Sequence, residues 1–147
     1  MIVWDNGTKK QRVYEIWEDN FHDPVSYANF YFNEVYGKNE VLLNEEMSAD
    51  ENLVKGMLHL NPYTLHVKGQ PAEAKYIVGV ATDEEYRRQG VMRELLVKTF
   101  QELRSRGELF TYLMPADENY YLPFDFVLEW LKVEQELEYL PELRKED

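Results

Sequence analysis

The hydrophobic pattern changes its period between residues 75 and 106, and this change limits the folds that the chain can adopt. Residues 75–82 (KYIVGVAT) are rich in β-branched side chains, which predicts a strand. Residues 90–106 predict a long amphipathic helix that ends before Gly107, with these apolar side chains on one stripe: Val91, Leu95, Leu96, Phe100 and Leu103. Residues 108–114 predict the next strand. A long helix that connects two neighbouring strands indicates a mixed α/β domain.

Two helices are expected near the N-terminus. Residues 8–11 (TKKQ) have the form of a capping box at the start of the first helix. Asp23 and Pro24 are predicted to be the N-cap and the first-turn proline of the second helix, which Gly37 would end. The apolar residues expected on the two helices are Val13, Ile16, Trp17, Ala28, Tyr31, Phe32 and Val35.

Further strands are predicted on both sides of the central segment. Pro62 and residues 69–71 (GQP) are interpreted as breaks, and Asn61-Pro62 with the short strands around it suggests an antiparallel hairpin. The expected strands before residue 75 are residues 40–44, 54–60 and 63–68. After the strand at 108–114 we expect a short turn or helix at 117–122 and two last strands, at 126–133 and 134–140.

Composition excludes several classes of protein. The 147 residues are the size of one domain, so we predict that residues 1–147 form a single domain. The chain has no cysteine and its three histidines lack metal-ligand spacing, so no disulfide and no metal are expected. Without a signal peptide or a membrane-spanning run, we expect a cytoplasmic protein with no membrane partner. Whether it forms a homo-oligomer is left open.

The formal charge of −12 bears on the choice of partner. It argues against nucleic acid, because binding phosphates requires clustered Lys and Arg. It favours a cationic partner such as an amine through long-range attraction. Acidity that serves only solubility is the simpler explanation and stays open.

The turn before the long helix is a candidate anion site. Gly90 stands at the helix start, where main-chain amides lack intrahelical partners and the helix dipole is positive. A glycine also lets an anion approach the backbone closely. The segment between Asp83 and Glu94 is slightly acidic, so an anion site there depends on main-chain amides, with arginines as helpers. Judged from the residues alone, such a turn more often only connects a strand to a helix and binds nothing.

Residues 87–92 (RRQGVM) resemble the Arg/Gln-x-x-Gly-x-Gly/Ala signature of the GCN5-related N-acetyltransferases (GNAT), with Met92 in place of the usual small residue. Residues 80–82 (VAT) resemble the end of the family's splayed strand. Residues 113–126, which contain LMPA and YLPFDF, resemble its later strand, short helix and Tyr-x-x-x-Gly-Phe ending, with Asp125 where glycine is usual. The resemblance implies a mixed, twisted sheet of about six or seven strands, splayed at the cofactor site and flanked by about four helices.

The resemblance also implies that acetyl-CoA is the co-substrate. The loop and helix start would hold its pyrophosphate through main-chain amides, and the end of the splayed strand would pair with its pantetheine arm. The cofactor-binding residues predicted in this way are Val80, Ala81, Thr82, Arg87, Arg88, Gln89, Gly90, Val91, Met92 and Arg93.

The catalytic residue that the resemblance implies is Tyr121, in the place of the family's general acid. A phenol with an ordinary pKa of about 10 is protonated at neutral pH and can donate its proton to a developing thiolate. Packing under the turn is the alternative role for Tyr121, and Tyr120 is the neighbour most easily confused with it. The base stays unassigned, since His59 on a strand is more simply structural and a water chain could deprotonate the amine.

The chain most resembles the N-terminal domain of the enhanced-intracellular-survival branch, which includes multi-acetylating aminoglycoside enzymes. Proteins of that branch usually continue into further domains, whereas these residues stop at Asp147, so aminoglycoside acetylation is only one of the acceptor reactions expected. We therefore predict an N-acetyltransferase that moves an acetyl group from acetyl-CoA to a primary amine of a small molecule or peptide. The alternative is a non-catalytic acyl-CoA-binding or interaction module on the same fold.

Overall fold

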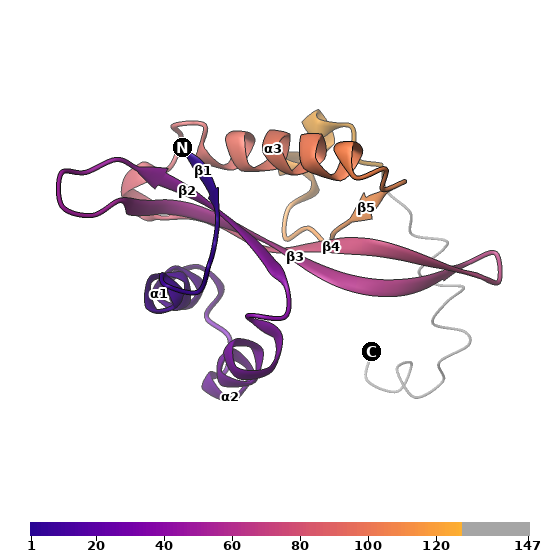
Figure 1. Ribbon diagram of the computed structural model, residues 1–147, viewed down its shortest axis with the longest axis horizontal. Helices are drawn as coiled ribbons and strands as arrows, with labels where there is room; N and C mark the ends of the chain where they lie inside the picture. The colour runs from indigo at the N-terminus through magenta and orange to yellow at the C-terminus, as the bar shows by residue number, and fades with distance from the viewer. Residues whose placement is uncertain (128–147) are drawn as a thin grey trace. The chain divides into compact units, whose positions relative to one another are not determined.

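The computed structural model describes residues 1–127, and Figure 1 shows their arrangement. The chain divides into a first unit, Met1–Leu113, and a second unit that begins at Met114, so a single domain stays a prediction. The strands, all in the first unit, are β1 (Ile2–Trp4), β2 (Glu40–Glu46), β3 (Leu53–Val67), β4 (Gln70–Thr82) and β5 (Thr111–Tyr112). The α-helices are α1 (Lys10–Phe21), α2 (Val25–Phe30) and α3 (Val91–Ser105). Short helical turns are Tyr31–Val35, Glu84–Tyr86, and, in the second unit, Glu118–Tyr120 and Leu122–Phe124.

The first unit is a mixed five-stranded sheet with helices on both faces. The strand order is β1-β2-β3-β4-β5, and all neighbours are antiparallel except β4 and β5, which are parallel and joined by α3. α1 and α2 lie on one face and α3 on the other (Figure 1). The predicted mixed fold is confirmed, but residues 1–127 contain five strands and three α-helices, fewer than expected. The strands expected at 126–133 and 134–140 lie outside the described residues, apart from Phe126 and Val127, which form no strand.

The core has one layer on each side of the sheet. On the α1 side, buried side chains of the two N-terminal helices pack against the inner strands, and the cluster consists of Val13, Ile16, Trp17, Tyr31, Phe32, Val41, Leu43, Val54, Met57 and Ala81. On the α3 side, Leu95 and Leu96 are fully buried. Leu58 and Leu60 alternate along β3 with the residues of the first layer, which places them on the α3 face.

The predicted side-chain caps of α1 and α2 are wrong. α1 begins at Lys10 without a side-chain cap, because the Thr8 hydroxyl donates to Asn6 Oδ1 (2.7 Å) instead. Asp23 does not cap α2 but accepts a hydrogen bond from the indole N–H of Trp17 (2.9 Å). In both cases the side chain has a partner outside the helix that it was expected to begin.

The break predicted at Pro62 is also wrong, because β3 runs through it. Leu60 is the last residue of β3 that pairs with β2, and from there on β4 is its only strand neighbour among the described residues. The missing N–H of Pro62 is tolerated on such a strand with one open edge. The hairpin turns instead at Lys68 and Gly69, whose φ angles of 51° and 76° suit a two-residue turn.

The two ends of the sheet also differ from the prediction. β1 at the N-terminus is an additional strand that the sequence pattern did not indicate. The strand expected at 108–114 is reduced to β5, which has two residues. Neither strand has a long alternating pattern of polar and apolar residues. β1 is a strand because it pairs with β2, and β5 because it pairs with β4.

β4 contains a bulge at Gly79, where its pairing with β3 shifts register. Gly79 has a φ of 62°, and a Cβ atom there would lie 2.7 Å from Cζ3 of Trp17 and 2.8 Å from Cδ2 of His59. Both the backbone angle and the close approach of two rings require glycine. The rings of Trp17 and His59 thus support the bulge from the α1 side.

His59 is fully buried beneath α1 and the turn that follows α2. Its Nδ1 lies 2.9 Å from the hydroxyl of Tyr31, and its Nε2 lies 3.4 Å from Sδ of Met57. Burial lowers the pKa of His59 to about 3, so the ring is neutral at physiological pH. A buried, neutral ring with these partners is structural.

The lowered pKa of His59 predicts a loss of stability in mild acid. The unfolded imidazole has a pKa of about 6.5, so between that value and about 3 only the unfolded chain binds this proton. The free energy of unfolding therefore has its full value above pH 6.5 and decreases as the pH falls toward 3. The decrease due to His59 is about 2 kcal/mol at pH 5. Urea unfolding between pH 8 and pH 5 should therefore show a steeper pH dependence for the wild type than for His59→Gln. His66→Gln, at an exposed position, is the control, and identical slopes for all three proteins would contradict the prediction.

Candidate functional site

The predicted cofactor-binding residues form one continuous segment of the first unit. Residues 80–82 are the end of β4, residues 87–90 form the loop after the turn Glu84–Tyr86, and residues 91–93 are the first turn of α3. The loop side chains are exposed, whereas Ala81 and Val91 are buried. The predicted order of strand, turn and long helix is confirmed. Their role in binding a cofactor stays a prediction.

One edge of β4 is free beside this segment. β4 and β5 pair at only two positions, Lys75 with Thr111 and Tyr76 with Tyr112. From residue 77 to residue 82, β4 is paired with β3 on one edge and has no strand on the other within the described chain. The two strands part before Thr82, as predicted. The main-chain N–H and C=O groups on that edge are therefore available to hydrogen-bond with a partner other than a strand of the described chain.

The start of α3 offers main-chain amides to an anion. The first helical hydrogen bond runs from the N–H of Glu94 to the carbonyl oxygen of Gly90 (3.0 Å), so the amides of Val91 and Met92 precede it. Gly90 has a φ of 79°, and apart from its chain neighbours no atom of the described residues lies within 4 Å of the place where its Cβ would be. Open space and the positive end of the helix dipole therefore coincide at Gly90.

The helix start lies close against the sheet at Gly56. A Cβ atom on Gly56 would lie 2.6 Å from Cγ1 of Val91 and 2.9 Å from the carbonyl oxygen of Ala81. A larger residue there would push α3 off the sheet or displace the end of β4. Gly56 is thus a residue of the site that the sequence analysis missed, since a lone glycine in a strand carries no functional signal by itself.

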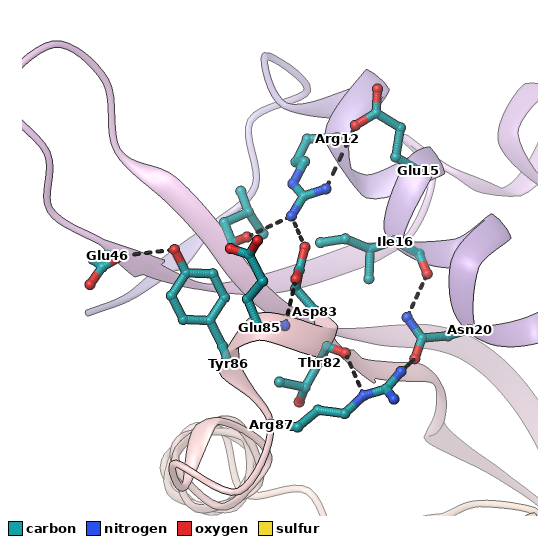
Figure 2. A network of polar contacts seen from close by, with 11 residues as sticks. Arg12, Glu15, Ile16, Asn20, Glu46, Thr82, Asp83, Glu85, Tyr86 and Arg87 are labelled. Atoms are coloured by element: carbon teal, nitrogen blue, oxygen red, sulfur yellow. Dashed lines mark hydrogen bonds and ion pairs between the residues drawn. The ribbon is translucent and has the colours of Figure 1, made fainter.

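A salt bridge ties the end of β4 to α1 (Figure 2). The guanidinium of Arg12 donates to the Asp83 carboxylate and to the carbonyl oxygen of Val54 (3.5 Å). The other carboxylate oxygen of Asp83 accepts from the N–H of Glu85 (3.0 Å), which caps the turn Glu84–Tyr86. Sequence spacing could not reveal this pair, because Arg12 and Asp83 are 71 residues apart.

Three further contacts in Figure 2 hold the turn and the loop. The hydroxyl of Tyr86 donates to Glu46 at the end of β2 (2.8 Å). Arg87 donates from Nε to the carbonyl oxygen of Thr82 (3.5 Å) and from Nη2 to Asn20 of α1 (3.1 Å). The Arg87 guanidinium therefore has protein partners, whereas Arg88 is exposed with a φ of 62°.

The Asp83 carboxyl has a pKa below its ordinary value. Burial acts to raise its pKa, but the Glu85 amide, the Arg12 guanidinium and the charge of Arg87 together lower it. A carboxyl with a lowered pKa stabilises the fold above its unfolded pKa of about 3.9, and the contribution is lost as the pH falls through the folded value.

Asp83→Asn should therefore destabilise the protein by about 1 kcal/mol at pH 7, because it removes the charge that pairs with Arg12 while keeping the shape of the side chain. The difference from the wild type should shrink below pH 4, where Asp83 itself becomes protonated. Urea unfolding at pH 7 and pH 3.5 measures both. Glu84→Gln, an exposed acidic neighbour, is the control. A difference between Asp83→Asn and the wild type that stays constant with pH would exclude the ionic contribution.

Tyr121 lies in the second unit, directly before the turn Leu122–Phe124. Its ring is half-buried and its centroid lies 5.9 Å from that of Phe126, edge to face, whereas Tyr120 is exposed. Asp125 ends this turn with a φ of 66°, the left-handed conformation that glycine usually supplies and that aspartate tolerates. Aspartate at this position is therefore compatible with a glycine-like turn.

Three other titratable side chains of β2 and β3 are buried or engaged elsewhere. His59 is fully buried and so cannot contact a substrate as a base. Glu45 is also buried, and Glu46 binds Tyr86. Within residues 1–127 no three His, Asp or Glu side chains lie together in a way that could hold a metal ion. No helix in the same range is long and apolar enough to cross a membrane.

Residues 6–128 match a protein family described as the acetyltransferase (GNAT) domain. The chain belongs to this family. No curated protein matches the chain. Solved structures that resemble this GNAT domain do so at low sequence identity, which supports the fold alone.

Three of these structures illustrate the range. A probable N-acyltransferase of unknown function from Enterococcus faecalis superposes with a TM-score of 0.72 at 15% identity, over 84% of this chain and 31% of that one. A GCN5-related N-acetyltransferase from Anabaena variabilis gives 0.69 at 21% identity, over 84% and 31%. A predicted acetyltransferase from Clostridium acetobutylicum, solved with acetyl-CoA, gives 0.70 at 14% identity, over 88% and 92%. The GNAT domain thus spans 31% of the length of two of these chains and nearly all of the third.

Proposed function

We propose that this GNAT domain is an N-acetyltransferase that moves the acetyl group of acetyl-CoA directly to a primary amine of a small molecule or peptide. The observation that carries the proposal is the free edge of β4 from residue 77 to residue 82, which leads directly to the open helix start at Gly90. An extended chain that ends in a phosphate matches these two features. Family membership and the acetyl-CoA complex of the Clostridium acetobutylicum protein support this choice of ligand.

The residues present fit acetyl-CoA. The pyrophosphate would lie at the amides around Gly90, with the exposed Arg88 as a positive charge of the adjoining loop. The pantetheine arm would form hydrogen bonds with the main chain of β4 near Ala81. Acetyl-CoA would supply a thioester, an acyl donor that is activated toward amines.

The transfer itself needs three protein-side conditions. The amine must reach the thioester carbon as a neutral nucleophile, so that its nitrogen forms the new C–N bond while the C–S bond breaks. The leaving thiolate needs a proton, which we assign to Tyr121. The base that takes the proton lost by the amine stays unassigned, because His59 on the neighbouring strand β3 is fully buried, and water can accept this proton.

The acceptor class follows from charge and from the resemblance of the sequence. The formal charge of −12 attracts cationic amines over long distances. The motif run from residue 79 to residue 126 resembles the enhanced-intracellular-survival branch, and two matched structures belong to chains about three times as long. We place the domain nearest that branch, with aminoglycosides among the amines to be tested.

Gly90→Asp tests the cofactor site. The new carboxylate would occupy the open space at the helix start and repel the pyrophosphate, so the affinity for CoA should fall at least tenfold in calorimetry. Gly37→Asp is a matched control, because Gly37 also has a positive φ (91°) and open space around its Cβ position. Equal affinities for CoA in both variants would place the cofactor elsewhere.

Tyr121→Phe tests the general acid. General acid catalysis contributes about 100- to 10,000-fold, so kcat should fall by a factor in that range while the affinity for CoA stays near that of the wild type. Tyr120→Phe, which removes an exposed hydroxyl from the preceding residue, should be much milder. The best amine from a screen is the acceptor in both assays. Equal turnover of the two variants would remove Tyr121 from the mechanism, and a wild type that binds CoA without turnover would be an acyl-CoA-binding module.

A further inference from the structure

Asn44 is a fully buried polar residue of β2 whose side chain contacts the first turn of α3. Its Nδ2 donates to Oε2 of Glu94 (2.9 Å) and to the carbonyl oxygen of Val91 (3.4 Å). Its Oδ1 is buried and has no hydrogen-bond partner among the described residues. One half of the amide therefore binds the helix start, and the other half is left unsatisfied.

An unsatisfied buried oxygen is unfavourable for folding. A leucine has the same number of side-chain heavy atoms as asparagine and no polar atom, and the neighbouring positions of β2 carry Leu42 and Leu43. Packing by itself would favour an apolar residue at position 44. The asparagine is therefore explained by what its Nδ2 does at α3.

The register of the sheet places Asn44 beside a close contact between the sheet and α3. Asn44 pairs with Gly56, whose missing side chain makes room for Val91. Gly56 sets how near the helix comes, and the bond from Asn44 to the Val91 carbonyl restricts how it turns about its axis. Together they determine where the amides of Val91 and Met92 point.

The bond to Glu94 has an electrostatic consequence. Glu94 is the acidic residue of the first turn of α3, where a carboxylate interacts favourably with the helix dipole and would compete with a bound phosphate. By hydrogen bonding to Asn44, the carboxylate is drawn toward β2. This leaves the positive helix end for another anion.

We propose that Asn44 is a positioning residue for the pyrophosphate of acetyl-CoA, acting through the main chain of Val91 and the carboxylate of Glu94. The inference rests on the proposed function, because it assumes that the helix start binds the pyrophosphate. It predicts that Asn44 matters for ligands that carry a pyrophosphate and not for ligands that lack one.

Binding of CoA and of pantetheine, measured by calorimetry or competition, separates these cases, because pantetheine lacks the pyrophosphate and the nucleotide. Asn44→Leu should weaken CoA binding about tenfold and leave pantetheine binding unchanged. In turnover assays the KM for acetyl-CoA should rise while kcat stays near that of the wild type. Thr99→Val is the matched control, because it removes another buried polar contact of α3, from the Thr99 hydroxyl to the carbonyl oxygen of Leu95 (2.8 Å).

Glu94→Gln extends the test to the electrostatic part. In the wild-type background it should change CoA affinity less than about twofold, because Asn44 already holds the carboxylate away. In the Asn44→Leu background it should restore much of the lost affinity, because the released side chain no longer carries a charge. Asn44→Ser, a smaller polar change, replaces Asn44→Leu if the latter does not fold.

Two results would overturn the inference. The first is that Asn44→Leu binds CoA as tightly as the wild type. The second is that Asn44→Leu loses affinity for CoA and for pantetheine by similar factors, and that Thr99→Val shows the same losses. Failure of the proposed function is visible separately. A wild type that binds CoA no better than pantetheine has no pyrophosphate site, and the inference about Asn44 then falls with it.

Discussion

The arrangement of the first unit depends on one edge of β4 having no strand partner, among the described residues, from residue 77 to residue 82. Backbone groups in a sheet normally find partners on both sides, yet within residues 1–127 β4 pairs with β5 at two residues and then continues to Thr82 with β3 as its strand neighbour on one edge. The continuation is possible because β3 pairs with β4 over nearly its whole length and supports it as one long hairpin. α3 begins after this edge, once the chain has passed the turn Glu84–Tyr86 and the loop to Gly90. The free strand edge and the helix start thus form an arrangement of main-chain groups that does not depend on the position of a catalytic side chain.

Both faces of the sheet contribute to holding this geometry. On the α1 face, Trp17 and His59 fill the space behind the bulge at Gly79. On the α3 face, Val91 packs into the space left by Gly56. At the end of β4, the salt bridge between Arg12 and Asp83 joins the turn to α1. The main chain of the site is thus supported by packing from above and below, which suits a ligand recognised through backbone groups.

In the proposed function, recognition through the backbone explains how an acidic chain would bind an anionic co-substrate. The segment around Gly90 has no excess of basic side chains, and Arg87 is partly engaged by Asn20. The positive potential therefore has to come from the amides at the helix start, which do not depend on net charge. The same overall acidity is available to attract a cationic acceptor. In the proposed reaction the amides at the helix start would attract the anionic co-substrate, and the net negative charge of the chain would attract the cationic acceptor.

The sequence by itself determined the local features of this protein. The change of hydrophobic period around Gly90 was sufficient to predict a strand, a turn and the helix α3, because these patterns depend on neighbours within a few residues. Local patterns left the caps undecided, because Thr8 and Asp23 bond to other residues close in sequence, Asn6 and Trp17. Tertiary structure decided the rest. Pro62 is accommodated because β3 has an open edge there among the described residues. Asn44 and Glu94 are 50 residues apart, so only folding shows that they meet. A contact between residues distant along the chain leaves no periodic trace in the sequence, and it is such contacts that hold the site.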